Sequence, residues 1–349
     1  MRADIKKEPF GTLPGGQEVS LYRLTNAAGM VVKITNYGAI ITSIVTPDKN
    51  GEAGEVALGF EDLEGYLQKQ PYFGSVVGRF ANRIKNARFS INGQEYELAA
   101  NKAPNHIHGG LSGFDKKVWQ AEELPALNGL KLTYTSPDGE EGYPGNLETT
   151  ITYSLTDDNE LTIRYQATTD KATPVNLTNH SYFNLTAGKS ELILDHVVQI
   201  ASDAYTLVDD TQVPTGEVQQ VEGTPMDFRE QHVIGERIAQ VPGGYDHNYI
   251  VPQADGSIKY VASVLDPESK RFMEVFTTMP GVQFYTGNAL DGSVKDKHGK
   301  VFVKQCALCL ETQHFPDAPN HEEFPSAILQ PGETYDHTTI YKFSVKKGA

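Results

Sequence analysis

The chain has 349 residues, of which 21% are charged, and its formal net charge is −15. This charge disfavours nucleic acid and anionic membranes as partners, because both would repel an acidic protein. The chain has no run of about 18 apolar residues that could span a membrane. Its charged start also lacks the apolar core of a secretory signal, so we expect a cytoplasmic protein. Cys306 and Cys309 are expected to be buried small residues in a reducing compartment.

Segments in which polar and apolar residues alternate dominate the chain and predict strands. A β-branched run covers residues 31–45 and is broken at Gly38. Asn92-Gly93, between the apolar pairs of 89–91 and 96–98, is a strong hairpin signal. Further strands are expected at residues 130–135, 147–155, 161–165, 192–200, 260–264, 272–278, 301–310 and 341–345.

Helical patterns are short and confined to residues 61–67 and 231–238. The 32 glycines and 19 prolines punctuate many short strands, which is typical of an all-β protein. No composition break or flexible linker divides the chain. We therefore predict a single domain over residues 1–349, built as one large antiparallel β-sandwich.

The segment 173–185 carries the most informative residue, His180. Read as a strand, it places Asn176, Thr178, His180 and Tyr182 on one face. Such a polar face costs desolvation free energy unless each group has a hydrogen-bonding partner, and a polar ligand would supply partners. A structural histidine whose hydrogen bonds are satisfied within the protein is the alternative.

Two further clusters precede that segment. Asn82 and Arg83 follow Gly78 and offer a neutral and a charged donor, and Arg83 could fork two bonds to sugar hydroxyls or a carboxylate. His106 and His108 have the spacing of a zinc pair, but no third ligand lies at metal-site spacing. His108, followed by two glycines, is instead a candidate binding residue.

Two more clusters follow it. Asp246 precedes a β-rich run, and Gln283 shares a strand face with Tyr285, a combination that suits either a sugar or ordinary packing. Glu311 is expected at the end of the strand 301–310, where a buried carboxylate is costly unless it is paired or functional. A turn aspartate and a surface carboxylate are the alternatives for Asp246 and Glu311.

Together these clusters resemble the aldose 1-epimerases, the galactose mutarotase family, in order and over nearly the whole chain. The resemblance rests on Gly-Arg-Phe-Ala-Asn-Arg-Ile at 78–84, His-Gly-Gly at 108–110, Asn-His-Ser-Tyr-Phe-Asn-Leu at 179–185, Asp-His-Asn-Tyr at 246–249 and Leu-Glu-Thr-Gln-His-Phe-Pro-Asp at 310–317. Segments 208–217 and 329–335 also look like family segments. So many matching segments in the same order make the resemblance specific to this family.

The resemblance implies a galactose mutarotase-like supersandwich and interconversion of the α and β anomers of a free aldose such as galactose or glucose. It assigns the acid to His180 and the base to Glu311, with no metal and no cofactor. It assigns sugar binding to Asn82, Arg83, His108, Tyr182, Asp246 and Gln283. The expected partner is a small monosaccharide, and the expected state is a monomer or homodimer.

Three other functions stay open. A carbohydrate-binding or sugar-sensing protein would use the same fold without turnover. A glycoside hydrolase would need a carboxylate pair, for which Glu311 and Asp246 are candidates. A relative acting on hexose 6-phosphates would need an added basic cluster, which the acidic composition does not suggest.

Overall fold

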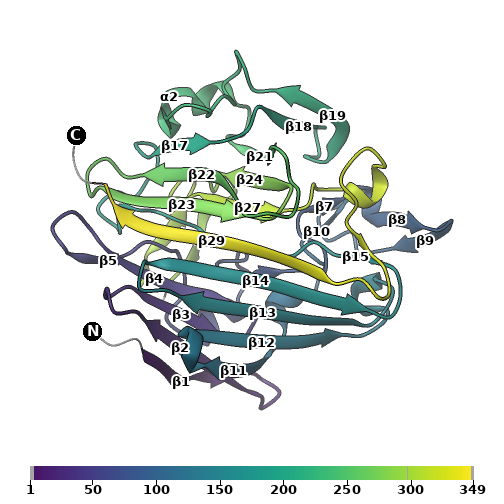
Figure 1. The fold of residues 1–349 in the computed structure, drawn as a ribbon, viewed down its shortest axis with the longest axis horizontal. Helices are drawn as coiled ribbons and strands as arrows, with labels where there is room; N and C mark the ends of the chain where they lie inside the picture. Colours follow the sequence, from purple (N-terminus) through teal and green to yellow (C-terminus); the bar gives the residue numbers. More distant parts are fainter. Residues whose placement is uncertain (1–3, 297, 347–349) are drawn as a thin grey trace.

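The computed structural model describes residues 4–296 and 298–346, and its regular structure is mainly antiparallel strand (Figure 1). The two α-helices of this part are short, α1 at Leu63–Leu67 and α2 at Ile234–Arg237. The all-β prediction is therefore confirmed. The single-domain organisation stays a prediction. The first residues, on which the expectation of no secretory signal partly depends, lie outside the described residues.

The largest sheet has nine strands, and each neighbouring pair is antiparallel. The last strand of the chain, β29, lies at its centre between β14 and β23 (Figure 1). In spatial order the strands are β11 (Gln120–Leu124), β12 (Gly129–Ser136), β13 (Leu147–Leu155), β14 (Glu160–Thr169), β29 (Tyr335–Val345), β23 (Arg271–Thr277), β22 (Lys259–Leu265), β17 (Val197–Ile200) and β20 (His232–Val233).

Two five-stranded sheets complete the sandwich. The N-terminal one runs β1 (Asp4–Thr12), β2 (Glu18–Thr25), β3 (Val31–Thr35), β4 (Ile41–Pro47) and β5 (Ala53–Glu55). The second runs β19 (Pro214–Gln220), β18 (Ala204–Val208), β21 (Asp246–Ile250), β24 (Gly281–Tyr285) and β27 (Cys309–Gln313).

One face of the nine-stranded sheet is buried against both smaller sheets. Along β13, buried residues alternate with partly exposed ones, as expected for a sheet with one face on the core. The hydroxyl of Tyr153 donates to the carbonyl of Ala39, and that of Tyr341 donates to the carbonyl of Leu310. These two buried bonds tie the large sheet to the connection between β3 and β4 and to β27, and the core is continuous across the three sheets.

Short strand pairs form the rest of the sheet structure. They are β6 (Val76–Val77) with β16 (Thr178–Asn179), β7 (Arg83–Ile84) with β10 (His106–Ile107), β8 (Arg88–Ile91) with β9 (Gln94–Glu97), β15 (Thr173–Pro174) with β28 (Ile328–Leu329), and β25 (Asp291–Lys295) with β26 (Val301–Val303). Asn92 and Gly93 join β8 to β9 with φ of 52° and 80°, so the predicted hairpin is confirmed.

Three predicted strands are wrong in part. Residues 192–196 form turns, and the expected strand begins only at β17. The run 301–310 splits into β26 and β27 at a turn in which Gln305 has φ of 63°. Residues 173–185 hold only the two-residue strands β15 and β16, because Asn176 between them bonds through its side chain to the backbone of Ala81 and His314 in place of a regular ladder.

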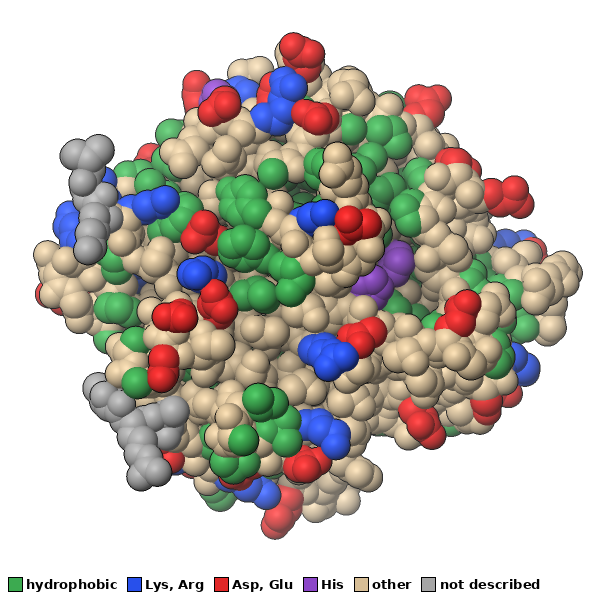
Figure 2. All heavy atoms as spheres, viewed as in Figure 1, with side chains coloured by type: hydrophobic (Ala, Val, Ile, Leu, Met, Phe, Trp, Pro, Cys, Tyr) green, Lys and Arg blue, Asp and Glu red, His purple; other side chains and the backbone are tan. Residues whose placement is uncertain are grey.

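Acidic and basic side chains lie interspersed over the face of the molecule shown in Figure 2. Within the described ranges, no helix has the length and apolar character needed to cross a bilayer.

Candidate active site

The floor of the site is one face of the three strands β21, β24 and β27. The register sets Asp246 opposite Tyr285, Tyr285 opposite Cys309, and Gln283 opposite Glu311. Because side chains alternate along a strand, these five residues share one face. The intervening Phe284 and Leu310 point into the core. Because successive side chains point to opposite faces, each strand presents apolar side chains to the core and polar side chains to the site. Glu311 lies in the middle of β27, not at a strand end as predicted, because the run before it is broken.

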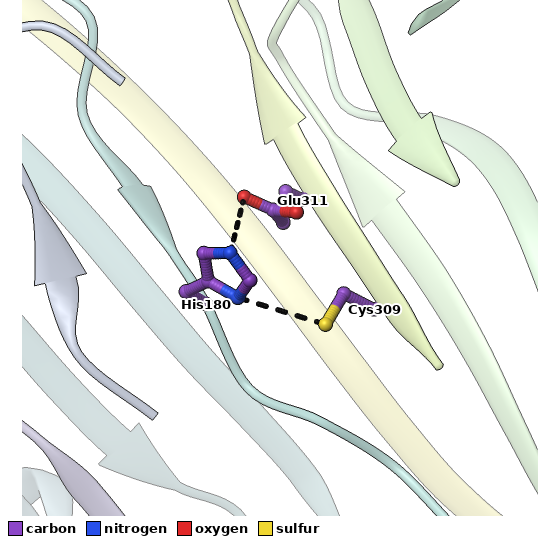
Figure 3. A group of neighbouring side chains, drawn as sticks. All are labelled: His180, Cys309 and Glu311. Atoms are coloured by element: carbon purple, nitrogen blue, oxygen red, sulfur yellow. Dashed lines mark hydrogen bonds and ion pairs between the residues drawn. The ribbon is translucent and has the colours of Figure 1, made fainter. Parts of the chain in front are cut away.

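His180 follows β16 and lies over that floor. Its backbone N–H donates to the carbonyl of Ser75, and its carbonyl accepts from the N–H of Gly74. The imidazole Nε2 lies 3.6 Å from Oε2 of Glu311, and its Nδ1 lies 3.6 Å from Sγ of Cys309 (Figure 3). The first distance is too long for a direct hydrogen bond. Both groups instead face a shared space.

Both members of this pair are buried, and burial shifts their pKa values in opposite directions. Desolvation lowers the pKa of His180 to about 4 and raises the pKa of the Glu311 carboxyl well above its ordinary value. Asp246 adds to the raised pKa of Glu311, while Arg83 opposes it. Oε2 of Glu311 accepts no hydrogen bond from any described residue, so a ligand hydroxyl would satisfy it.

Arg83 and Asn82 form the next side of the site. Asn82 has φ of 64°, and its side-chain oxygen accepts from the backbone N–H and guanidinium of Arg83. Nη2 of Arg83 donates to Oε1 of Gln212 at 2.6 Å and lies 3.8 Å from Asp246. These contacts fix the guanidinium beside the floor, and the Asp246 carboxylate lies close enough to offset its positive charge.

Two hydrogen bonds with the backbone of Asn82 hold His108 in place. The N–H of Asn82 donates to Nδ1 of His108, and the carbonyl of Asn82 accepts from the N–H of His108. Burial, His180 and Arg83 hold the pKa of His108 well below its ordinary value. A neutral ring that accepts at Nδ1 carries its proton at Nε2 and is a donor there.

His106 faces away from this site. Its Nδ1 bonds to the carbonyl of Ala99 and its Nε2 to the hydroxyl of Tyr143, so both ring nitrogens are occupied. The zinc pair of His106 and His108 that the sequence left open is therefore not formed.

Gln283 lies behind Asp246. Its Nε2 donates to Oδ1 of Asp246 at 2.7 Å, and its Oε1 accepts from Nε2 of Gln313. Gln313 also donates to Asn248. Gln283 is 3% exposed and borders no part of the cavity surface described below. Its contacts orient the Asp246 carboxylate, while the sugar contact expected for Gln283 stays a prediction.

A cavity of about 450 Å³ opens above the floor. This volume falls in the usual range for a small-molecule site. Seven of the predicted site residues line it: Asn82, Arg83, His108, His180, Tyr182, Asp246 and Glu311. Its rim includes Lys69 and Lys102, which the sequence analysis did not anticipate. A larger cavity of about 670 Å³ adjoins it and shares Lys69, Pro71, Tyr72, Asn101, Lys102 and Ala289.

Besides the two lysines, sequence reasoning missed Tyr72 and Gln212, and it misjudged Asn176 and Thr178. Tyr72 and Gln212 both line the cavity, and both have positive φ. The one sequence signal for either is that Gln212 belongs to the family-like segment 208–217. Asn176 and Thr178 do not line it: the amide of Asn176 bonds to the backbone of Ala81 and His314. The polar face predicted for residues 176–182 therefore contributes only His180 and Tyr182.

His180, Cys309 and Glu311 also place potential ligand atoms within 4.8 Å of one another. Metal binding needs the thiolate form of cysteine. Burial and the neighbouring carboxylates raise the pKa of the Cys309 thiol, which favours the thiol. These three residues are a poor metal site.

Comparison with known proteins places the chain in a family. The family model for aldose 1-epimerase matches residues 20–342. Galactose mutarotase of Mus musculus is 50% identical over 343 residues, which cover 98% of this chain and 99% of the mouse protein. Aldose 1-epimerase of Escherichia coli (strain K12) is 38% identical, over 95% of this chain and 96% of that protein.

The fold gives the same result. The crystal structure of galactose 1-epimerase from Lactobacillus acidophilus NCFM matches with a TM-score of 0.85 and 27% sequence identity. The match covers 99% of this chain and 100% of that one. The expected galactose mutarotase-like sandwich is thereby confirmed. The chain belongs to the aldose 1-epimerase family, whose enzymes act on monosaccharides.

Proposed function

We propose that His180 and Glu311 carry out the aldose 1-epimerase reaction of this chain on free aldohexoses such as galactose and glucose. The observation that carries the proposal is the 3.6 Å approach of Nε2 of His180 to Oε2 of Glu311 inside a cavity of sugar size. An acid and a base that face one space can act on two oxygens of one anomeric centre.

The reaction is balanced by one proton moving in and one moving out. Glu311 as carboxylate takes the proton of the anomeric hydroxyl, and His180 as imidazolium gives a proton to the ring oxygen. The bond between C1 and the ring oxygen breaks, and C1 becomes an aldehyde carbonyl. After rotation about the C1–C2 bond, the ring hydroxyl attacks the other face of the carbonyl, and both protons return to their original groups.

The pair begins and ends each cycle with one proton between its two members. Burial disfavours the imidazolium form of His180 and the carboxylate form of Glu311, so desolvation of the two charges costs free energy. The 3.6 Å approach of opposite charges and the nearby Arg83 offset part of that cost. One proton for two sites is the state that general acid–base catalysis needs.

The remaining lining residues are proposed to bind the sugar. Arg83, Asn82 and neutral His108 present donors, and the Asp246 carboxylate presents an acceptor, which together suit a ring of hydroxyl groups. Tyr182 stacks on His180 with ring centroids 5.0 Å apart and provides an apolar surface beside the polar groups. Gln283 is proposed to act through Asp246 by fixing its carboxylate.

Polarimetry of a freshly dissolved α-anomer tests the proposal. We expect His180→Asn and Glu311→Gln each to lose more than about 99% of the rate, because general acid–base groups contribute roughly 10²–10⁴-fold each. Circular dichroism should show both variants folded. Near-normal interconversion in either variant would contradict the assignment.

Substrate choice is measured in the same assay with galactose, glucose and galactose 6-phosphate. We expect the free sugars to react faster. A faster reaction of the phosphorylated sugar would assign Lys69 and Lys102 at the rim to a phosphate and contradict this substrate choice. Binding without interconversion would favour the carbohydrate-binding alternative.

We also propose a cytoplasmic location and a monomeric or homodimeric state. The location is supported by Cys306 and Cys309, which are both buried and form no disulfide within the described residues. Cell fractionation and size-exclusion chromatography with light scattering test these two proposals.

A further inference from the structure

Tyr72 holds an unusual position beside the proposed acid. Its backbone has φ of 63°, in the left-handed region that glycine adopts freely and that costs other residues free energy. Non-glycine residues in such conformations cluster at functional sites, where the surrounding structure holds them. A glycine would fit this backbone without strain, so we ask whether the side chain of Tyr72 has a function that a glycine could not perform.

The turn that bears Tyr72 is fixed to His180 through the backbone. The carbonyl of Tyr72 accepts from the N–H of Ser75, whose own carbonyl accepts from His180. Gly74 in the same turn donates to the carbonyl of His180. Two backbone bonds therefore join the turn to His180, and the position of the Tyr72 ring relative to the imidazole is set by main-chain contacts.

The rings themselves are close and nearly parallel. The Tyr72 ring lies 6.0 Å from that of His180, with 17° between their planes, and 4.7 Å from that of His108. Tyr182 lies nearly parallel to the same imidazole, at 5.0 Å and 16°. The faces of aromatic rings attract a cation within about 6 Å, and His180 is a cation when it carries the proton for the ring oxygen.

Tyr72 also borders both the catalytic cavity and the adjoining cavity of about 670 Å³. Its ring thus lies where the two spaces meet. Removing it would widen the space beside the imidazole and leave the ring of His180 less firmly held.

We propose that Tyr72 is a positioning residue of the epimerase, whose ring orients the His180 imidazole toward Glu311 and favours the imidazolium form. This inference rests on the proposed role of His180 as the acid. The other groups that face His180 are Glu311 and Cys309 of β27, Tyr285 of β24, His108 after β10, and Tyr182. His108 also has a positive φ, of 51°, but among the described residues that contact the His180 ring only Tyr72 combines such a backbone with a turn hydrogen-bonded to the His180 main chain.

Three substitutions separate the ring from the hydroxyl and from the backbone. Tyr72→Phe keeps the ring and should retain kcat to within about threefold. Tyr72→Leu keeps the strained backbone but loses the ring, and kcat should fall roughly 10–100-fold, the usual effect of a misplaced catalytic group. Tyr72→Gly relieves the backbone strain and should lose as much activity, although the protein should unfold no more readily.

The pH dependence and the Michaelis constant distinguish positioning from sugar binding. In Tyr72→Leu and Tyr72→Gly, KM should change by less than about threefold, and the acid limb of the kcat profile should move to lower pH because the imidazolium has lost a stabilising ring. Tyr37→Leu is the matched control, since Tyr37 borders only the adjoining cavity. It should leave kcat and the profile unchanged.

Two results would overturn the inference: wild-type kcat with an unchanged profile in both ring-less variants, or a rise in KM alone. Failure of the proposed function gives a different result, because His180→Asn would then retain activity. Loss of activity in His180→Asn with full activity in Tyr72→Leu would reject the role of Tyr72 and leave the acid assigned.

Discussion

His180 and Glu311 are two buried titratable groups whose shared proton state decides whether the pocket is active. Desolvation lowers the pKa of His180 to about 4 and raises that of Glu311 well above its ordinary value. Two ionisable groups this close influence each other, so the protonation of one depends on that of the other. The active form has one proton on the pair.

This proton count predicts a bell-shaped pH dependence of kcat/KM. As the pH falls toward about 4, His180 gains a proton while Glu311 is already protonated, and no base remains. As the pH rises past the raised pKa of the carboxyl, the pair loses its only proton, and no acid remains. Initial polarimetric rates from about pH 3.5 to about pH 10 measure both limbs. A rate independent of pH across that range would contradict the one-proton state.

At single positions, the sequence was informative where a residue belongs to a distinctive string. Arg83, His108 and Asp246 were predicted in this way, and all three line the cavity. Tyr72 and Gln212 were not predicted, because their roles depend on turns with positive φ that bring them over residues distant in sequence. A tyrosine between Pro71 and Phe73, or a glutamine in a polar loop, carries no local signal of such a contact.

Elements whose geometry is set by neighbouring residues were predicted well. The hairpin of β13 and β14 and that of β8 and β9 pair residues near in sequence, and the turn residues specify the connection. The runs 301–310 and 173–185 have the composition of buried strands, yet both are broken. Their breaks depend on contacts with distant segments, such as Asn176 with Ala81, which alternation cannot reveal.

The β8–β9 turn gives a direct test of this local specification. Gly93 has φ of 80°, and a Cβ there would meet no atom within 4 Å, so substitution costs only backbone strain. We expect Gly93→Ala to lower the free energy of unfolding by about 1–2 kcal/mol. Gly15 is the matched control, because it has equal space but lies outside the left-handed region.

Urea unfolding followed by fluorescence compares the two variants. Gly15→Ala should leave the stability unchanged or slightly increased. Equal effects of the two substitutions would show that φ at position 93 does not matter.

Across the whole molecule, three histidines away from the pocket are favoured in the neutral form: His196 and His314 are buried, and His337 is half-buried. Desolvation lowers the pKa of His196 to about 4, of His314 to about 3 and of His337 to about 4. A histidine with a lowered folded pKa stabilises the protein above its unfolded pKa of about 6.5 and loses that contribution as the pH falls toward the folded value. Acid therefore acts on the core as well as on the active site.

We expect the free energy of unfolding to fall between pH 7 and pH 5, by up to about 1.4 kcal/mol per pH unit below 6.5 for each such histidine. Urea titrations at the two pH values measure the change. His337→Gln should make the decline shallower, whereas substitution of the exposed His298 by Gln should leave it as it is. A stability equal at both pH values would contradict this expectation.

The central place of β29 in the large sheet has a consequence for synthesis on the ribosome. Its neighbours β14 and β23 are more than a hundred residues apart in sequence and meet only through this last strand. A nascent chain that has not yet released Tyr335–Val345 therefore presents two unpaired strand edges. The large sheet therefore cannot close until Tyr335–Val345 has left the ribosome, and a chain arrested before that point exposes both edges to aggregation.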